Sequence, residues 1–174
     1  MEYTFTLKYQ LADDGCTSDE LVERLAESGC DDALVGIGQP GRLALEFTRE
    51  ATDAEQAVLS ALSDVRRAVA SAKLIEVAPD LVGLTDVAEI VGVSRQNMRK
   101  LMLTHPSSFP TPVHEGSASI WHLADVLTWL QARGSYSLTR SVLEVARVAS
   151  QINVAKEGRR LPALALKELE TLVG

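Results

Sequence analysis

The sequence predicts an α+β protein with two unlike parts, a small antiparallel sheet with two helices followed by a mainly helical part. The first half of the 174-residue chain combines stretches of alternating apolar residues with helix-capping signals, whereas the second half carries mostly helical patterns. Charge divides the chain in the same way. Residues 1–82 hold 16 acidic and 7 basic side chains, residues 83–134 four of each, and residues 135–174 four acidic and six basic.

Composition narrows the classes of protein that the chain can belong to. Apolar residues make up 46% and charged residues 24%, which suits one ordinary globular domain or two small ones. No run approaches the ~18 apolar residues of a membrane helix, and the start lacks the pattern of a signal peptide. We therefore expect an intact cytoplasmic chain with no membrane partner. The net charge of −7 argues against a general polyanion binder.

The chain opens with a strand signal and a helix signal. Apolar side chains alternate with polar ones over residues 3–9, which predicts a strand with one buried face. Residues 17–20 have the Thr-x-x-Glu spacing of a capping box and predict a helix that ends at Gly29. The apolar stripe of this helix consists of Leu21, Val22 and Leu25.

Three further elements complete a recognisable order. Residues 33–37 and 43–47 predict two strands joined by a turn, a second capping box at residues 52–55 predicts a longer helix, and residues 74–77 predict a closing strand. The order β-α-β-β-α-β usually makes one antiparallel four-stranded sheet with both helices on one face, the ferredoxin-like arrangement. We predict such a domain at residues 1–78. We expect it to bind a small ligand or a protein partner, or only to dimerise, since this fold assigns no function.

The segment after an expected linker at residues 79–83 carries the most specific pattern in the chain. Two helices that meet at a tight turn need a small residue at the contact, here Ala88, and a residue tolerant of left-handed backbone, here Gly92. Thr85 and Ser94 stand where an N-cap would start each helix. Apolar residues fill the five interface positions, which are Val87, Val91, Val93, Met98 and Leu101.

The second of these helices exposes side chains suited to the major groove of DNA. Arginine can pair with guanine, and Gln or Asn with adenine, whereas lysine, serine and amides at a helix start hold phosphates. None of residues 94–100 is acidic. The segment therefore predicts double-stranded DNA as a partner. The side chains expected on this face are Ser94, Arg95, Gln96, Asn97, Arg99 and Lys100.

A hairpin and a further helix follow. Residues 109–114 and 118–122 flank a turn at residues 115–117, which predicts a two-stranded wing. Residues 123–130 predict an amphipathic helix that closes at Gly134. The three histidines have no cysteine or paired carboxylate at ligand spacing, so we predict no catalytic site, no metal and no cofactor.

From about Leu84 to Arg133 this succession resembles the winged helix-turn-helix heads of the MerR and excisionase (AlpA-like) families. The likeness rests on the two helices, a Phe-Pro-x-Pro segment at residues 109–112, the wing, and a helix that carries Trp129. It implies a winged helix-turn-helix domain at residues 84–134. The matching helix contacts are Arg95, Gln96, Arg99 and Lys100, and the matching wing contacts are His114, Ser117 and Ser119. Thr85, Ser94 and Asn97 complete the DNA-binding set. Glu115 departs from the basic residues common in family wings.

Residues 135–174 predict two C-terminal helices. Apolar residues recur at coiled-coil spacing over about two heptads, which fits either a dimer-forming helix or a helix packed on its own domain. These residues are Leu138, Val142, Val145, Ala149 and Ile152. A last helix is expected from Pro162, with Leu164, Leu166, Leu169 and Leu172. MerR-type regulators are similar in carrying a dimer-forming helix after the head, which implies a homodimer.

These features predict a bacterial, sequence-specific DNA-binding transcriptional regulator, a repressor that acts as a homodimer and is not an enzyme. Two other classes of protein fit the same sequence. One is an antitoxin-like or adaptor protein whose acidic first domain binds a protein partner. The other is an architectural factor of recombination or excision that bends DNA.

Overall fold

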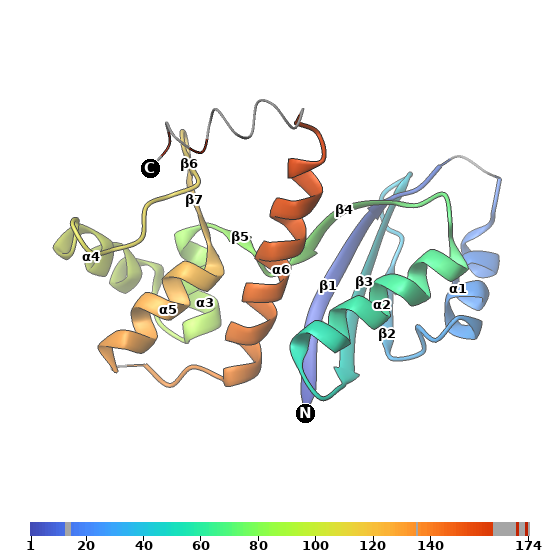
Figure 1. Ribbon diagram of the computed structural model, residues 1–174, viewed down its shortest axis with the longest axis horizontal. Helices are drawn as coiled ribbons and strands as arrows, with labels where there is room; N and C mark the ends of the chain where they lie inside the picture. Colours follow the sequence, from blue (N-terminus) through green and yellow to red (C-terminus); the bar gives the residue numbers. More distant parts are fainter. Residues whose placement is uncertain (13–14, 135, 162–169, 171–172, 174) are drawn as a thin grey trace.

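The computed structural model describes residues 1–12, 15–134, 136–161, 170 and 173 (Figure 1). The N-terminal group comprises β1 (Glu2–Gln10), α1 (Ser18–Glu27), β2 (Ala33–Gly36), β3 (Arg42–Glu50), α2 (Ala54–Ala68) and β4 (Lys73–Ala78). The second group comprises β5 (Leu81–Val82), α3 (Leu84–Val91), α4 (Arg95–Thr104), β6 (His114–Glu115), β7 (Ser119–His122) and α5 (Leu123–Arg133). The long helix α6 (Arg140–Gly158) lies between the two groups (Figure 1).

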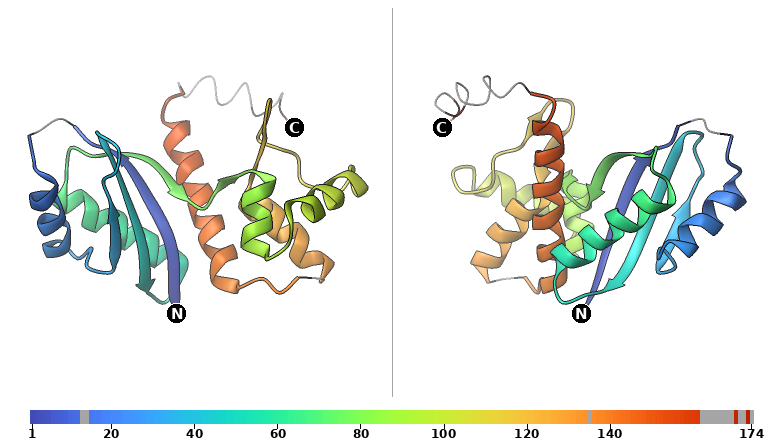
Figure 2. Two further views of the ribbon diagram at one scale, coloured as in Figure 1. Left: turned by 180° about the vertical axis from the view of Figure 1, so that it is seen from behind. Right: turned by 45° about the vertical axis from the view of Figure 1, so that its right-hand side comes forward.

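The N-terminal strands form one sheet in the order β2-β3-β1-β4, and all neighbours are antiparallel. This is the order expected of two interleaved split β-α-β units. β1 pairs along its whole length with β3, from Glu2 opposite Glu50 to Gln10 opposite Arg42. Both α1 and α2 lie on one side of the sheet (Figure 2). The predicted β-α-β-β-α-β sheet is therefore confirmed.

The alternation in the sequence decides which face of the sheet is buried. Odd-numbered residues of β1 and β3 face the helices, and the stacked rings of Phe5 and Phe47 lie 5.3 Å apart at the centre of this core. One charged residue shares the buried face. Arg49 is 9% exposed and forms ion pairs of 2.7 Å with Asp32 and Asp64, and the bond to Asp32 raises the pKa of its guanidinium.

The start of α1 agrees with the prediction from the sequence, whereas the start of α2 differs from it. The capping box of α1 is formed, because Thr17 Oγ1 accepts the N–H of Glu20 while Glu20 accepts the N–H of Thr17. The residue that caps α2 is Asp53 and not Thr52, since the Asp53 carboxylate accepts the N–H of Gln56 at 2.8 Å. The N-cap predicted at Thr52 is therefore wrong by one position, and the reciprocal bond from Glu55 is replaced by Gln56, which accepts the N–H of Thr52 at 3.0 Å.

One residue of the stripe predicted in α1 is misplaced. Leu21 and Leu25 are buried, whereas Val22 is 42% exposed. Each residue turns the helix by about 100°, so a side chain directly after Leu21 points away from the core that Leu21 enters.

Helix α6 belongs to two hydrophobic cores at once. Val145 and Ala149 are buried in the core of the sheet, while Leu143 and Ala146 are buried in the core of the second group. The stripe that fitted a coiled coil is thus covered within the chain. The alternative of a helix packed on its own chain describes α6, and a dimer formed through this stripe stays a prediction.

Side chains of α6 also pair with the outer edge of β4. The Asn153 amide donates to the carbonyl of Val77 at 2.8 Å and accepts the N–H of Val77 at 2.9 Å. Lys156 donates to the carbonyl of Ile75. These bonds satisfy backbone groups that an edge strand otherwise leaves open. They fasten the helix to the sheet.

The segment expected as a linker contributes to the second group. Leu81 and Val82 form β5, which pairs with His122 and Trp121 of β7. Asp80 is 1% exposed. The backbone between the groups is therefore held by both of them, and the domain boundaries at residues 78–84 and 134 stay predictions.

The helix predicted from Pro162, with its four leucines, lies outside the described residues. In the part of the chain that the structure describes, no helix combines the length and apolarity needed to cross a membrane.

Candidate nucleic-acid interface

Helices α3 and α4 meet at the tight turn that the sequence predicts. Gly92 ends α3 with a φ of +76°, a left-handed conformation that L side chains rarely adopt. Val87, Ala88 and Met98 are buried between the helices. Val91, Val93 and Leu101 are partly buried against the same core. The predicted helix pair and its apolar interface are confirmed.

The two helices begin differently. Ser94 caps α4 as expected, and its hydroxyl accepts the N–H of Asn97 at 3.1 Å. The cap of α3 is Gly83 and not Thr85, because the Asp86 carboxylate accepts the N–H of Gly83 at 2.8 Å. Thr85 instead lies inside the first turn with its side chain exposed.

The outer face of α4 carries a continuous set of exposed donors. Arg95, Gln96, Asn97, Arg99 and Lys100 are all exposed, whereas Met98 on the same helix is buried. Within the described part of the chain, no hydrogen bond or ion pair engages the side chains of these five residues. Their donors therefore face solvent and are available to a partner.

Leu103 belongs to this face and was not among the residues predicted to contact DNA. It is 60% exposed and lies four positions after Arg99 and three after Lys100, so it shares their side of the helix. This spacing was visible in the sequence. An exposed leucine beside arginines can contact the methyl group of thymine.

The hairpin brings its turn next to α4. β6 and β7 pair at His114–Ile120 and Glu115–Ser119, and the turn spans residues 116–118. The His114 ring covers Gly116 so closely that a Cβ there would lie 2.6 Å from Nε2. Part of the first predicted strand, residues 109–113, is not a strand in the structure.

The reason for this difference is the packing of Phe109. Its ring contacts Trp121 and Trp129 edge-on, with centroids 6.0 Å and 5.1 Å apart. The Trp121 indole N–H donates to the carbonyl of Pro110 at 3.0 Å. This aromatic cluster anchors the hairpin to α5.

A hollow between α3, α4 and the hairpin turn gathers half of the predicted contact residues. It is also lined by Met102 and Trp121. Ser94, Gln96, Asn97 and Lys100 lie elsewhere on exposed α4, and His114 is exposed on β6. The predicted residues that line the hollow are Thr85, Arg95, Arg99, Ser117 and Ser119.

A second polar cluster contains the side chains of a hydrolase but not their geometry. His122 Nδ1 lies 2.6 Å from Asp80 Oδ1 and 3.2 Å from Ser150 Oγ. A histidine that activates a serine uses its second ring nitrogen for that contact while the first binds the carboxylate. Here both partners meet Nδ1. The cluster joins β7, α6 and the segment before β5.

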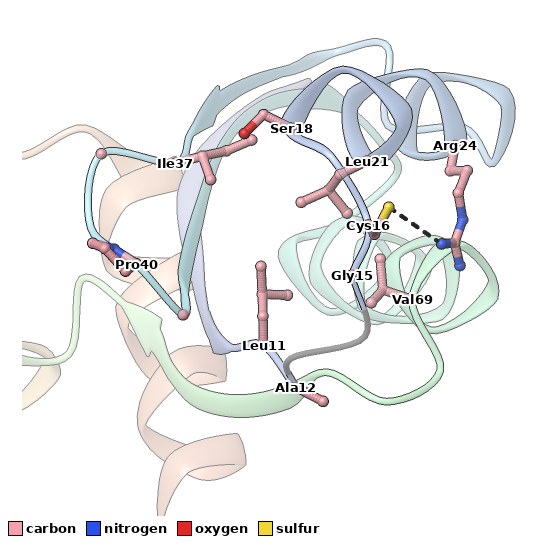
Figure 3. A pocket seen from close by; sticks show the side chains of 12 residues that line it. Leu11, Ala12, Gly15, Cys16, Ser18, Leu21, Arg24, Ile37, Pro40 and Val69 are labelled. Atoms are coloured by element: carbon pink, nitrogen blue, oxygen red, sulfur yellow. Dashed lines mark hydrogen bonds between the residues drawn. The ribbon is translucent and has the colours of Figure 1, made fainter.

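The N-terminal group has a hollow of its own, of about 650 Å³ (Figure 3). Leu11, Leu21, Ile37 and Val69 form apolar walls, and Arg24 lies at one side, where it donates to the sulfur of Cys16 at 3.7 Å. This is where a small apolar ligand of the first domain would fit. Such a ligand stays a prediction.

Comparisons of the chain with protein-family models, with curated proteins and with solved structures find no match. The description of the molecule therefore rests on its own fold and site. It is an α+β chain that presents an exposed cationic helix beside a short hairpin. Across the described residues, no three His, Cys, Asp or Glu side chains are grouped to hold a metal ion.

Proposed function

We propose that the protein is a sequence-specific DNA-binding transcriptional regulator that uses α3 and α4 as a helix-turn-helix and the β6–β7 hairpin as its wing. One observation carries this proposal. The exposed face of α4 holds arginines, amides and a lysine without a carboxylate, and its arginines share a hollow with serines of the hairpin turn. In this assignment α4 enters the major groove and the hairpin contacts the backbone.

The residue types divide into two roles. Arg95 and Arg99 lie one turn apart beside the hairpin, so both can reach base edges along one groove wall. Gln96 adds an amide that can read adenine. Lys100 and the hydroxyls of Thr85 and Ser117 hold phosphates and set the position of the helix.

Local charge supports this assignment although the chain is acidic. The acidic excess lies in residues 1–82, and residues 83–134 are balanced. Glu115 at the hairpin is exposed and disfavours a deep minor-groove contact there. Specificity then falls mainly on α4.

Selection of bound duplexes from a random library tests the proposal. The full chain should enrich one motif, and Arg99→Ala should weaken binding to that motif by about 5- to 150-fold, which corresponds to about 1–3 kcal/mol. Lys100→Ala should weaken binding to all sequences alike and lower the salt slope by about 1.

Arg66→Ala is the matched control, because Arg66 is an exposed cation on α2, outside the interface. It should leave affinity and motif unchanged. The proposal fails if no motif is enriched, or if the control weakens binding as much as Arg99→Ala does.

A further inference from the structure

In the described part of the chain, no helix or strand covers the face of the sheet opposite α1 and α2 (Figure 2). Even-numbered residues of β1 and β3 point to this face, and most of them are exposed. Leu34 of β2 is 74% exposed there, and no described residue packs over it. An open sheet face of this kind is available to a partner.

Charge is distributed unevenly along this face. Glu2 and Glu50 are opposite each other at one end, while Arg42 and Lys73 flank Gln10 at the other. Eight residues separate the ends, about 26 Å of strand, which exceeds the screening length of about 8 Å at physiological salt. The face therefore has one acidic end and one basic end.

The middle of the face is nearly neutral. Lys8 and Glu76 form an ion pair of 2.6 Å and compensate each other. Glu46 is the remaining charge. The rest is small or uncharged, namely Thr4, Thr6, Leu34, Gly36, Ala44, Thr48 and Ala78.

We propose that this face binds the same face of a second copy of the chain, about a two-fold axis that lies in the interface across the strands. This axis places Glu50 opposite the partner subunit's Arg42, and Glu2 near the partner subunit's Lys73. Each contact occurs twice, because a two-fold interface repeats every pair. An axis along the strands would instead join like charges.

The available area fits a reversible dimer. Strands of nine, nine, four and six residues, at about 3.3 Å per residue and about 4.8 Å spacing, give roughly 450 Å² per copy and roughly 900 Å² in total. That total lies among weak, transient interfaces, below the roughly 1,200 Å² at which stable ones begin. The dimer is independent of DNA binding, since none of these residues belongs to the interface around α4.

At the centre of the open face, the same axis brings two like charges together. It places Glu46 over the partner subunit's Glu46, so this pair repels. Neutralising Glu46 should strengthen the dimer, whereas neutralising Glu50 should weaken it. The same change from a carboxylate to an amide on β3 should therefore strengthen the dimer at Glu46 and weaken it at Glu50.

Sedimentation equilibrium of the full chain at about 1–200 µM tests the proposal. Wild type should reach twice the chain mass of 18.8 kDa. The variant E2R/E50R has two basic ends and the variant R42E/K73E has two acidic ends, so each should be monomeric. An equimolar mixture of the two should restore the dimer.

E23R/E27R is the matched control, because both residues are exposed on α1, away from the open face. It should dimerise like wild type. Glu46→Gln and Glu50→Gln keep side-chain size and serve if a charge reversal impairs folding, and they should shift the dissociation constant in opposite directions, each by at least about threefold.

A monomeric wild type over this concentration range overturns the proposal. So does a mixture of the two reversed variants that stays monomeric, or a Glu46→Gln variant that weakens the dimer. None of these readouts uses DNA.

Discussion

The side-chain amide of Asn153 makes buried hydrogen bonds between α6 and the sheet, and its removal should destabilise the whole chain. Asn153 is 8% exposed and makes three hydrogen bonds, two with the backbone of Val77 and one of 2.8 Å to Asp80 Oδ2. Val77 is fully buried and Asp80 nearly so. Asn153→Ala leaves these three groups without their partner.

The size of the effect follows from the burial of those groups. Three buried groups left without a partner cost about 1–3 kcal/mol each, which sets an upper range of about 3–9 kcal/mol. A hollow lined by Asp80, His122 and Asn153 lets water replace part of the loss. We therefore expect about 2–3 kcal/mol, a large share of the 5–15 kcal/mol typical of a domain.

Urea unfolding, followed by two spectroscopic signals, measures this loss of stability and shows whether it extends to both groups of the fold. Far-UV circular dichroism reports the whole chain, while fluorescence reports Trp121 and Trp129, which both lie in the second group. Both midpoints should fall together, because α6 shares the two cores. Gln151→Ala, an exposed position on the same helix, should change stability by less than about 0.5 kcal/mol. A loss for Asn153→Ala no larger than this control would show that these hydrogen bonds do not stabilise the chain.

Three further predictions use other parts of the chain. Gly92→Ala should cost about 1–2 kcal/mol in urea unfolding because of the left-handed backbone, whereas Gly158→Ala, where φ is not positive, should cost nothing. Burial raises the pKa of the Cys30 thiol to about 11, so its alkylation at pH 8, read by mass spectrometry, should be slow until urea unfolds the chain. Bonds from Arg140 and Tyr3 lower the pKa of Glu144, so their stabilisation is present above the ordinary carboxyl pKa and lost as pH falls through the lowered one. The stability difference between wild type and Tyr3→Phe should therefore be larger at pH 7 than in acid, where Glu144 is protonated.

The first half of the fold was predictable because its signals are local. In a strand with one buried face, apolar and polar side chains must alternate, and a helix start needs a capping side chain. The pattern of residues 3–9 and the presence of Thr17 were therefore enough to predict β1 and the start of α1. The errors arose where two neighbours compete for one role. Thr52 and Asp53 can both cap a helix, and only the backbone path into α2 selected Asp53.

The candidate interface was predictable in its residues but not in its grouping. The exposed face of α4 follows from helical periodicity once Met98 and Leu101 are assigned to the core. The packing of Phe109 against the two tryptophans positions the hairpin. This position is what brings Ser117 and Ser119 into the same hollow as Arg95 and Arg99. Such packing joins residues distant in sequence and leaves no periodic pattern.

Most helices and strands of this protein, the order of the N-terminal sheet and the donor-rich helix that motivates the DNA-binding proposal follow from local patterns in the sequence. Tertiary structure alone decided the partner of α6. Its apolar stripe suits a second helix or the chain's own sheet equally well, because burial of apolar area has no direction. The geometry of β4 settled the choice, since Asn153 meets the open backbone of Val77 only when α6 lies along that edge. The open sheet face, in place of the helix, is then the surface left for a second copy.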